Sequence, residues 1–299
     1  MKAASTSWLG PFAGAWLTPL RRRALRDGFW LVAVASLVPY LALFVLPHWV
    51  GLDGHAYWQA WQGPGLYTAP PASRDAFLYS PLFAQLVRPL AGLPWAGFLG
   101  VWVIVQAAIF VWLLRPLPGR WFVVAYLACL PEVFEANING LYALMIVLGF
   151  RWSASWAFAL ITKIAPGLGL LWFAVRREWR QLATPLLLTA ALSVLSYLVW
   201  PSAWQDWLAF LGQNGGAGGD KTAYLIPRLV LAAIVVAAGA RTGRTWTVPV
   251  AVVLASPVLF LDTLTVLAAV PRLRRAVPAA AAGGGGAGPA GRSGALRTT

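Results

Sequence analysis

Residues 29–50, FWLVAVASLVPYLALFVLPHWV, form an uninterrupted stretch without a charged side chain. A helix needs about 20 such residues to cross a hydrocarbon core roughly 30 Å thick. Similar apolar stretches recur along the chain, and charged residues make up only 11% of it, whereas a soluble domain has roughly 25%. The sequence therefore predicts an all-α fold, a polytopic transmembrane helical bundle of about eight to ten membrane segments.

Basic clusters between the apolar segments give the chain a net charge of +14. A nucleic-acid-binding protein would instead gather its basic residues on one face or stripe. Short clusters beside membrane segments are typical of cytoplasmic loops, where they also attract anionic lipids. We therefore expect membrane lipid as a partner and no nucleic acid.

Charge and composition divide the chain into three parts. Residues 1–28 are basic and precede the first apolar stretch, which predicts a cytoplasmic N-terminal segment, followed by an uncleaved anchor. We expect a transmembrane domain over residues 29–275, in a multi-pass protein of the plasma (inner) membrane. Its polar and aromatic segment 51–78 then forms an outer loop that is long enough for short interfacial helices. The Gly/Ala-rich tail 276–299 is expected to be disordered.

Placing every basic cluster on the cytoplasmic side requires an even number of crossings between successive clusters. Residues 121–150 meet this condition as a hairpin. Its outer tip then carries Glu132, Glu135, Asn137 and Asn139.

Residues 153–175 have the length of one crossing, yet arginines flank them on both sides. Either one flank breaks the positive-inside rule, or the helix breaks near Lys163 and Pro166 and turns back. The same ambiguity recurs in WTVPVAVVLASPVLFLDTLTVLAAV, residues 246–270, which contains Asp262.

Asp53 lies three residues beyond the first apolar stretch, at the expected outer face. On a helix, its four-residue spacing from Tyr57 puts the two side chains on one face, and His55 stands between them in sequence. An Asp in this position also fits a helix N-cap. Capping and catalysis do not exclude each other, so both interpretations stay open.

Lys163 stands inside the apolar stretch 153–175. A cation at the centre of a membrane helix costs about 2.5–3.5 kcal/mol on insertion scales, and such residues usually face a cavity and have a partner. Snorkelling to the interface works poorly from the middle of a segment. An anion held between the helices would suit this lysine, and Pro166 would free backbone groups close to it.

The segment RDAFLYSPLFAQLVRPLAGLPW, residues 74–95, supplies two further cations, Arg74 and Arg88, which can pair with phosphate. Tyr79 and Pro81 mark the entry to a membrane helix in the same segment. The chain contains no phosphate-binding glycine loop, zinc-ligand spacing or nucleophilic serine elbow. No metal site is predicted, although acids from different segments could converge at the outer face.

Five short motifs follow one another in a fixed order. They are Asp53-x-x-x-Tyr57, GPGLYT at 63–68, FLYSPLFAQLVRPLAGLP at 77–94, ANINGLYALMIVLGFR at 136–151 and ALITKIAPGLGLLWFAVRREWR at 159–180. In this order the chain resembles glycosyltransferase family 87, polytopic and mannosyltransferase-like enzymes of the C-type membrane glycosyltransferase fold. The resemblance runs from about residue 29 to 200, and more faintly through LASPVLFLDTLTVL at 254–267.

The resemblance implies a transferase that moves a hexose, with mannose favoured, from a polyprenyl phosphate to a lipid-linked or cell-envelope acceptor on the outer face, with inversion. The sugar arrives on its lipid donor, so no separate cofactor is expected. Asp53 is implied as the catalytic carboxylate, in agreement with the need for a base that takes the proton of the acceptor hydroxyl. The leaving group is already a phosphate, so one carboxylate can suffice.

The donor phosphate needs cationic contacts, for which Lys163, Arg74 and Arg88 are candidates in that order. We expect the following side chains to contact substrate: Tyr57, His55, Arg74, Tyr79, Arg88, Asn137, Asn139 and Lys163.

Two alternatives remain open. A non-catalytic transporter or flippase of lipid-linked sugars would use Lys163 as a midplane contact in a helix that crosses once, although no internal repeat is obvious in the sequence. A relative that keeps the fold and has lost the chemistry is the other. The transferase interpretation predicts instead that Lys163 lies near the outer cavity, close to Asp53.

Overall fold

The computed structural model describes residues 19–63, 65–71, 73, 75–163, 165–214, 224–257 and 259–275. Regular structure in these ranges is helical and contains no strand, which confirms the predicted all-α class. Arg74, the N-terminal residues 1–18 and the Gly/Ala-rich tail 276–299 lie outside the described residues, so the expectations for them are not addressed.

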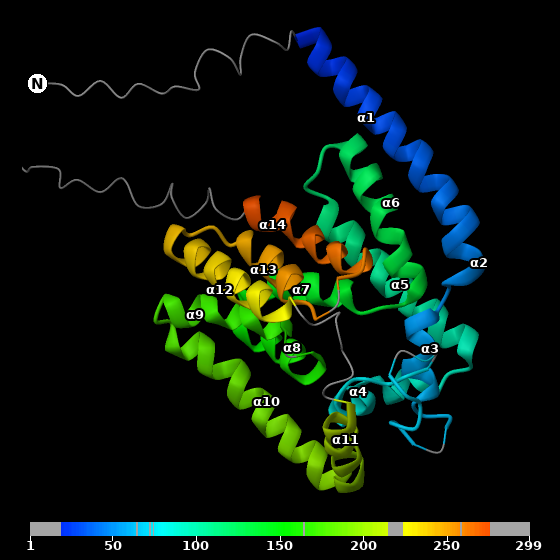
Figure 1. Ribbon diagram of the computed structural model, residues 1–299, viewed down its shortest axis with the longest axis vertical. Helices are drawn as coiled ribbons and strands as arrows, with labels where there is room; N and C mark the ends of the chain where they lie inside the picture. Colours follow the sequence, from blue (N-terminus) through cyan, green and yellow to red (C-terminus); the bar gives the residue numbers. More distant parts are fainter. Residues whose placement is uncertain are drawn as a thin grey trace, which may run out of the picture.

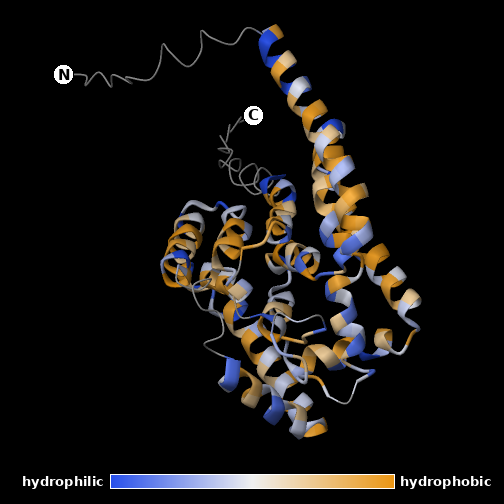
Figure 2. Ribbon diagram, turned by 45° about the vertical axis from the view of Figure 1, so that its right-hand side comes forward, coloured by the Kyte–Doolittle hydropathy of each residue, from blue (hydrophilic) through white to orange (hydrophobic). Residues whose placement is uncertain are grey.

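Four helical stretches in the described residues are long and apolar enough to cross a membrane. They are Pro19–Gln59, which contains α1 (Pro19–Tyr40), α2 (Leu46–His48) and α3 (Leu52–Gln59), and then α5 (Trp95–Leu114), α10 (Trp179–Val199) and α12 (Leu225–Thr242). A π-helical turn, Leu41–Val45, joins α1 to α2. Large apolar side chains such as Val32, Ile104 and Leu187 point outward and stay exposed, and Figure 2 shows this hydrophobic character along most of α1. The protein is therefore a multi-pass membrane protein.

The other apolar segments form three bent helix pairs. The first joins α6 (Gly119–Glu135) to α7 (Asn139–Gly149) at 117°. The second joins η2 (Ser153–Trp156) and α8 (Ala157–Thr162) to η3 (Ala165–Leu170) and α9 (Leu171–Val175). The third joins α13 (Thr247–Ala255) to η5 (Asp262–Ala269) and α14 (Val270–Arg275). We call the three breaks the tips: Ala136–Ile138, Lys163, and the turn that leads into Asp262.

The second pair turns back on itself at Lys163. Rings from before and after the break lie side by side, since Trp156 and Phe173 are 6.5 Å apart and Phe150 is 5.2 Å from Trp172. Lys163 itself has an extended backbone, which ends α8. Of the two alternatives left open for residues 153–175, the structure has the break near Lys163.

The third pair turns back in the same way, because the Thr245 hydroxyl before α13 donates to the Leu273 carbonyl in α14 (3.3 Å). The described residues thus hold four candidate crossings, or five if the bent pair α6–α7 is counted as one. The sequence estimate of about eight to ten membrane segments is larger because it counts the short helices of these pairs as separate segments.

Basic clusters from different segments meet at one end of the molecule, which we call the basic end. Contacts between them are those of Arg120 with Asp27, of Arg176 Nη1 with the Ala240 carbonyl (3.1 Å), and of Arg272 Nε with the Trp112 carbonyl (2.7 Å). The arginines ahead of the first apolar stretch continue into α1, which begins at Pro19 and runs along one edge of the molecule (Figure 1).

The opposite end, which we call the tip end, carries α3, α4 (Pro81–Ala91) and α11 (Pro201–Asn214) (Figure 1). α3 lies within residues 51–78, the segment expected to form an outer loop, and α4 follows that segment. Tyr57 packs α3 onto its neighbours, with ring centroids 5.5 Å from Phe83 of α4 and 5.4 Å from Trp102 of α5. This aromatic core fixes the position of α3 at the end of the bundle.

Candidate functional site

Asp53 is held against the first tip by two close backbone approaches. Gly51 adopts a left-handed conformation (φ 72°), and its N–H donates to the Phe134 carbonyl at 2.6 Å. Gly54 lies directly on Ala136, because a Cβ added at Gly54 would stand 2.6 Å from the Ala136 Cβ. The N-cap of α3 is Gly51 and makes no side-chain capping bond. Asp53 is thus in the first turn of α3, and the N-cap interpretation of this residue is wrong.

Gly54→Val is expected to destabilise the protein by about 1–3 kcal/mol, because the added methyl groups push α3 off Ala136. The transfer activity that the resemblance implies should fall with it, since Asp53 moves away from the tip. Thermal unfolding in detergent and a transfer assay measure the two effects. Gly28→Val in α1 is the matched control, because nothing lies within 4 Å of a Cβ there. Equal unfolding midpoints for the two variants would contradict the close approach.

Tyr57 and Tyr79 line the buried side of the site. Their hydroxyl oxygens are 3.1 Å apart, and both side chains are buried. Tyr79 lies in the loop before α4, where burial and then the nearby charge of Asp53 raise the pKa of its hydroxyl well above its ordinary value. Tyr79 therefore stays protonated at neutral pH and can donate a hydrogen bond, but it does not serve as a base.

The first tip is fixed by hydrogen bonds to two carboxylates, those of Glu132 and Asp262. Asn139 donates to Glu132 from both its backbone N–H (2.6 Å) and its side-chain amide (2.9 Å). The side-chain amides of Asn137 and Asn139 also donate to Asp262 Oδ2, at 3.0 and 3.2 Å. Asp262 therefore joins the third tip to the first, and the two asparagine amides are largely occupied by contacts within the protein.

Lys163 forms the second tip and reaches the same region. Its side chain is exposed, and Nζ lies 5.4 Å from the centre of the Tyr79 ring. The Tyr142 hydroxyl donates to Thr162 Oγ1 at 3.0 Å, which ties the residue before Lys163 to α7. The charges of Lys163 and Asp53 attract each other, although the two side chains form no ion pair in the described part of the chain. The exposed ammonium of Lys163 is therefore accessible to an anionic group of a substrate.

The three tips and α3 thus build one polar cluster. It consists of Asp53, Tyr57, Tyr79, Glu132, Glu135, Asn137, Asn139, Tyr142, Lys163 and Asp262. Asp262 interacts electrostatically with Asp53 and with Glu135, and Glu132 is completely buried. Buried acids in a membrane protein usually mark a functional site.

Two of the expected substrate contacts lie elsewhere at the tip end. His55 Nδ1 is 2.5 Å from Asp75 Oδ1, and its ring lies 4.8 Å from that of Trp95. The Arg88 guanidinium lies 4.9 Å above the Trp61 ring. His55 is close to Asp53 in the sequence and Arg88 is not, and in the folded chain both contact other partners.

Asp262 and Glu132 were not among the expected site residues. Asp262 interrupts an apolar segment just as Lys163 does, so the cost of a charge in such a segment would have identified it. The sequence places Glu132 at the outer tip of its hairpin. Nothing in the residues next to Glu132, such as Pro131, indicates how deeply the Glu132 side chain is buried.

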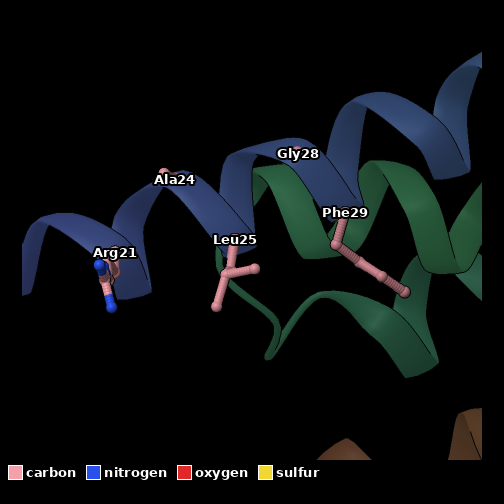
Figure 3. Close-up of a pocket in the computed structure, with 5 residues that line it drawn as sticks. All are labelled: Arg21, Ala24, Leu25, Gly28 and Phe29. Carbon is pink, nitrogen blue, oxygen red and sulfur yellow. The ribbon is translucent and has the colours of Figure 1, made fainter. Parts of the chain in front are cut away.

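A shallow hollow of about 440 Å³ lies far from this cluster, at the basic end of α1 (Figure 3). All its lining residues come from α1, and they are Arg21, Ala24, Leu25, Gly28 and Phe29. It contains no carboxylate and is not the candidate site. Within the described residues, no three His, Cys, Asp or Glu side chains are arranged to hold a metal ion.

The model of glycosyltransferase family 87 matches residues 77–286, which is more than half of the chain. No curated protein and no solved structure matches. The match contains Lys163, Asp262 and the first tip but begins after Asp53, so Asp53 is linked to the matched region through its position in the fold.

Proposed function

The chain belongs to glycosyltransferase family 87 and is a membrane glycosyltransferase, and we propose that its donor is a polyprenyl phosphate that carries a hexose, with mannose as the favoured sugar. The acceptor is a lipid-linked or cell-envelope glycan. One observation carries the proposal: Lys163 and Asp53 come from distant segments of the chain and meet at Tyr79, whose ring centre is 5.4 Å from Lys163 Nζ and whose hydroxyl contacts that of Tyr57, on the face of α3 that carries Asp53. The donor phosphate needs a cation beside it, and the reacting hydroxyl needs a base that takes its proton.

The chemistry assigned to this pair is a single displacement. Asp53 takes the proton of the acceptor hydroxyl while the hydroxyl oxygen bonds to the anomeric carbon. The bond from that carbon to the phosphate oxygen breaks on the opposite face, so the configuration inverts and polyprenyl phosphate leaves. The leaving phosphate gains negative charge, which Lys163 stabilises.

The other members of the polar cluster hold and complement this pair. Tyr79 is a neutral donor beneath Lys163 and suits a sugar or phosphate oxygen. Asn137 and Asn139 act mainly by fixing the first tip, because their amides are bound to Glu132 and Asp262. The lipid donor explains why the enzyme is embedded in a membrane, since the prenyl chain stays in hydrocarbon while its head reaches the cluster.

We further propose that the tip end faces the outside of the plasma (inner) membrane and the basic end faces the cytoplasm. The joined arginine clusters of the basic end support this orientation through the positive-inside rule. A transporter of lipid-linked sugars would need Lys163 in a single crossing helix. The break at Lys163 and its exposed side chain favour the transferase.

Membranes that contain the protein should transfer labelled mannose from polyprenyl-phosphate mannose to candidate lipid acceptors. Right-side-out vesicles should expose the labelled product to a mannosidase added outside, without lysis. Membranes without the protein are the control. An absence of transfer with every donor sugar and acceptor would overturn the proposed activity, and removal of the label only after lysis would reverse the orientation.

A further inference from the structure

An apolar groove of about 650 Å³ runs beside the polar cluster, between α1, α6 and the segment formed by η5 and α14. This volume lies in the range of ligand-binding pockets, roughly 300–1,000 Å³. Its wall from α6 consists of small or apolar residues, among them Ala125, Ala128 and Cys129. The facing wall includes Leu264, Leu267 and other apolar residues of η5.

Polar groups in this groove are confined almost entirely to its two ends. Tyr40 and Asp262 lie at the tip end, and Trp246 and Arg274 lie at the basic end. Thr265 lies between them, but its hydroxyl is used by the Asp262 carbonyl at 2.5 Å. The middle of the groove therefore offers no free hydrogen-bonding group and suits a hydrocarbon chain.

The length of the groove decides between kinds of hydrocarbon chain. From Asp262 to Arg274 the chain rises by about 20 Å, at roughly 2 Å per residue in a 3₁₀-helix and 1.5 Å in an α-helix. One leaflet of the hydrocarbon core is only about 15 Å thick. An acyl chain of an outer-leaflet lipid ends near the midplane, whereas a long isoprenoid chain can continue past it toward the basic end.

The groove and the polar cluster share Asp262, whose carboxylate binds Asn137 and Asn139 of the first tip. We propose that the groove binds the distal isoprenoid units of the lipid donor, so that the enzyme selects donors by chain length. This inference rests on the proposed function. Because the free tail lies in lipid rather than in water, packing and not the hydrophobic effect supplies the preference, and we expect it to be about threefold to tenfold in kcat/KM.

The test places a large side chain in the groove. Ala128 lines the groove and is exposed, so Ala128→Trp fills it without overpacking the interior. The wild type should prefer a long-chain polyprenyl-phosphate mannose over a two-isoprene analogue. Ala128→Trp should remove that preference and leave turnover of the short donor unchanged. Ala108→Trp, on the exposed side of α5 away from the groove, should behave as the wild type.

Retained turnover of the short donor shows that Ala128→Trp is folded. If Ala128→Trp does not fold, Ala125→Trp, one turn along the same groove wall, replaces it. A wild-type enzyme that is active but keeps its chain-length preference in both groove variants overturns the inference. A change confined to the KM of the acceptor also overturns it, because the groove would then hold the acceptor lipid. Failure of the proposed function is distinguished by the wild type alone, which would transfer from neither donor.

Discussion

Asp53→Asn is expected to slow transfer by about 10²- to 10⁴-fold, the contribution typical of a positioned general base. The amide has the same shape as the carboxylate but cannot accept the proton of the acceptor hydroxyl. Contacts to the substrates should persist, so kcat falls while the KM of donor and acceptor change little. Initial rates with labelled donor, measured on purified protein, give both constants.

The matched control for this variant is Asp206→Asn, which removes an exposed carboxylate from α11 at the same end of the molecule. It should transfer at the wild-type rate. Both variants should elute from size exclusion as the wild type does, since neither change alters packing. Turnover of Asp53→Asn within threefold of the wild type would remove Asp53 from the catalytic role and direct attention to Glu135 or Asp262, two of the other acids of the cluster.

The second and third bent pairs could be predicted from the sequence only as one of two alternatives, although charge imposes parity on membrane crossings. Arginines on both sides of residues 153–175 put a single crossing in conflict with the positive-inside rule, so a break near Lys163 and Pro166 was one of the two alternatives. The structure has this break, with Lys163 at the turn. The same two alternatives applied to residues 246–270, and the structure has a break there too, before Asp262.

The membership of the site was predictable only in part, because sequence neighbours are not always spatial neighbours. Tyr57 follows Asp53 by four residues and shares its face of α3, whereas His55 follows by two and points away, to Asp75. Asp262 is distant from Asp53 along the chain. Its contact with Asn137 depends on how the first and third helix pairs pack together, which no local pattern in the sequence encodes.

Lys163→Met is expected to lower kcat/KM for the donor by about 10²- to 10³-fold, the effect of removing one preorganised contact to a developing anion. The donor phosphate carries one negative charge before transfer and gains a second as it leaves. Lys163 should therefore matter more in the transition state than in the bound donor. Both a higher donor KM and a lower kcat are expected, with the KM of the acceptor unchanged.

Two further variants separate charge from structure. Lys163→Arg keeps the cation and should recover part of the lost rate, less than all of it because the guanidinium has a different shape. Arg88→Met removes a cation that is stacked on Trp61 and should leave the donor constants near their wild-type values. If Lys163→Met kept normal transfer but abolished movement of a lipid-linked sugar across vesicles, Lys163 would serve transport, and the pairing of Lys163 with Asp53 would have no catalytic meaning. If Arg88→Met reproduced the donor defect instead, the phosphate would bind over α4 and not beside Tyr79. Arg88 and Lys163 come from different elements, so a phosphate that moves from one to the other moves the whole donor.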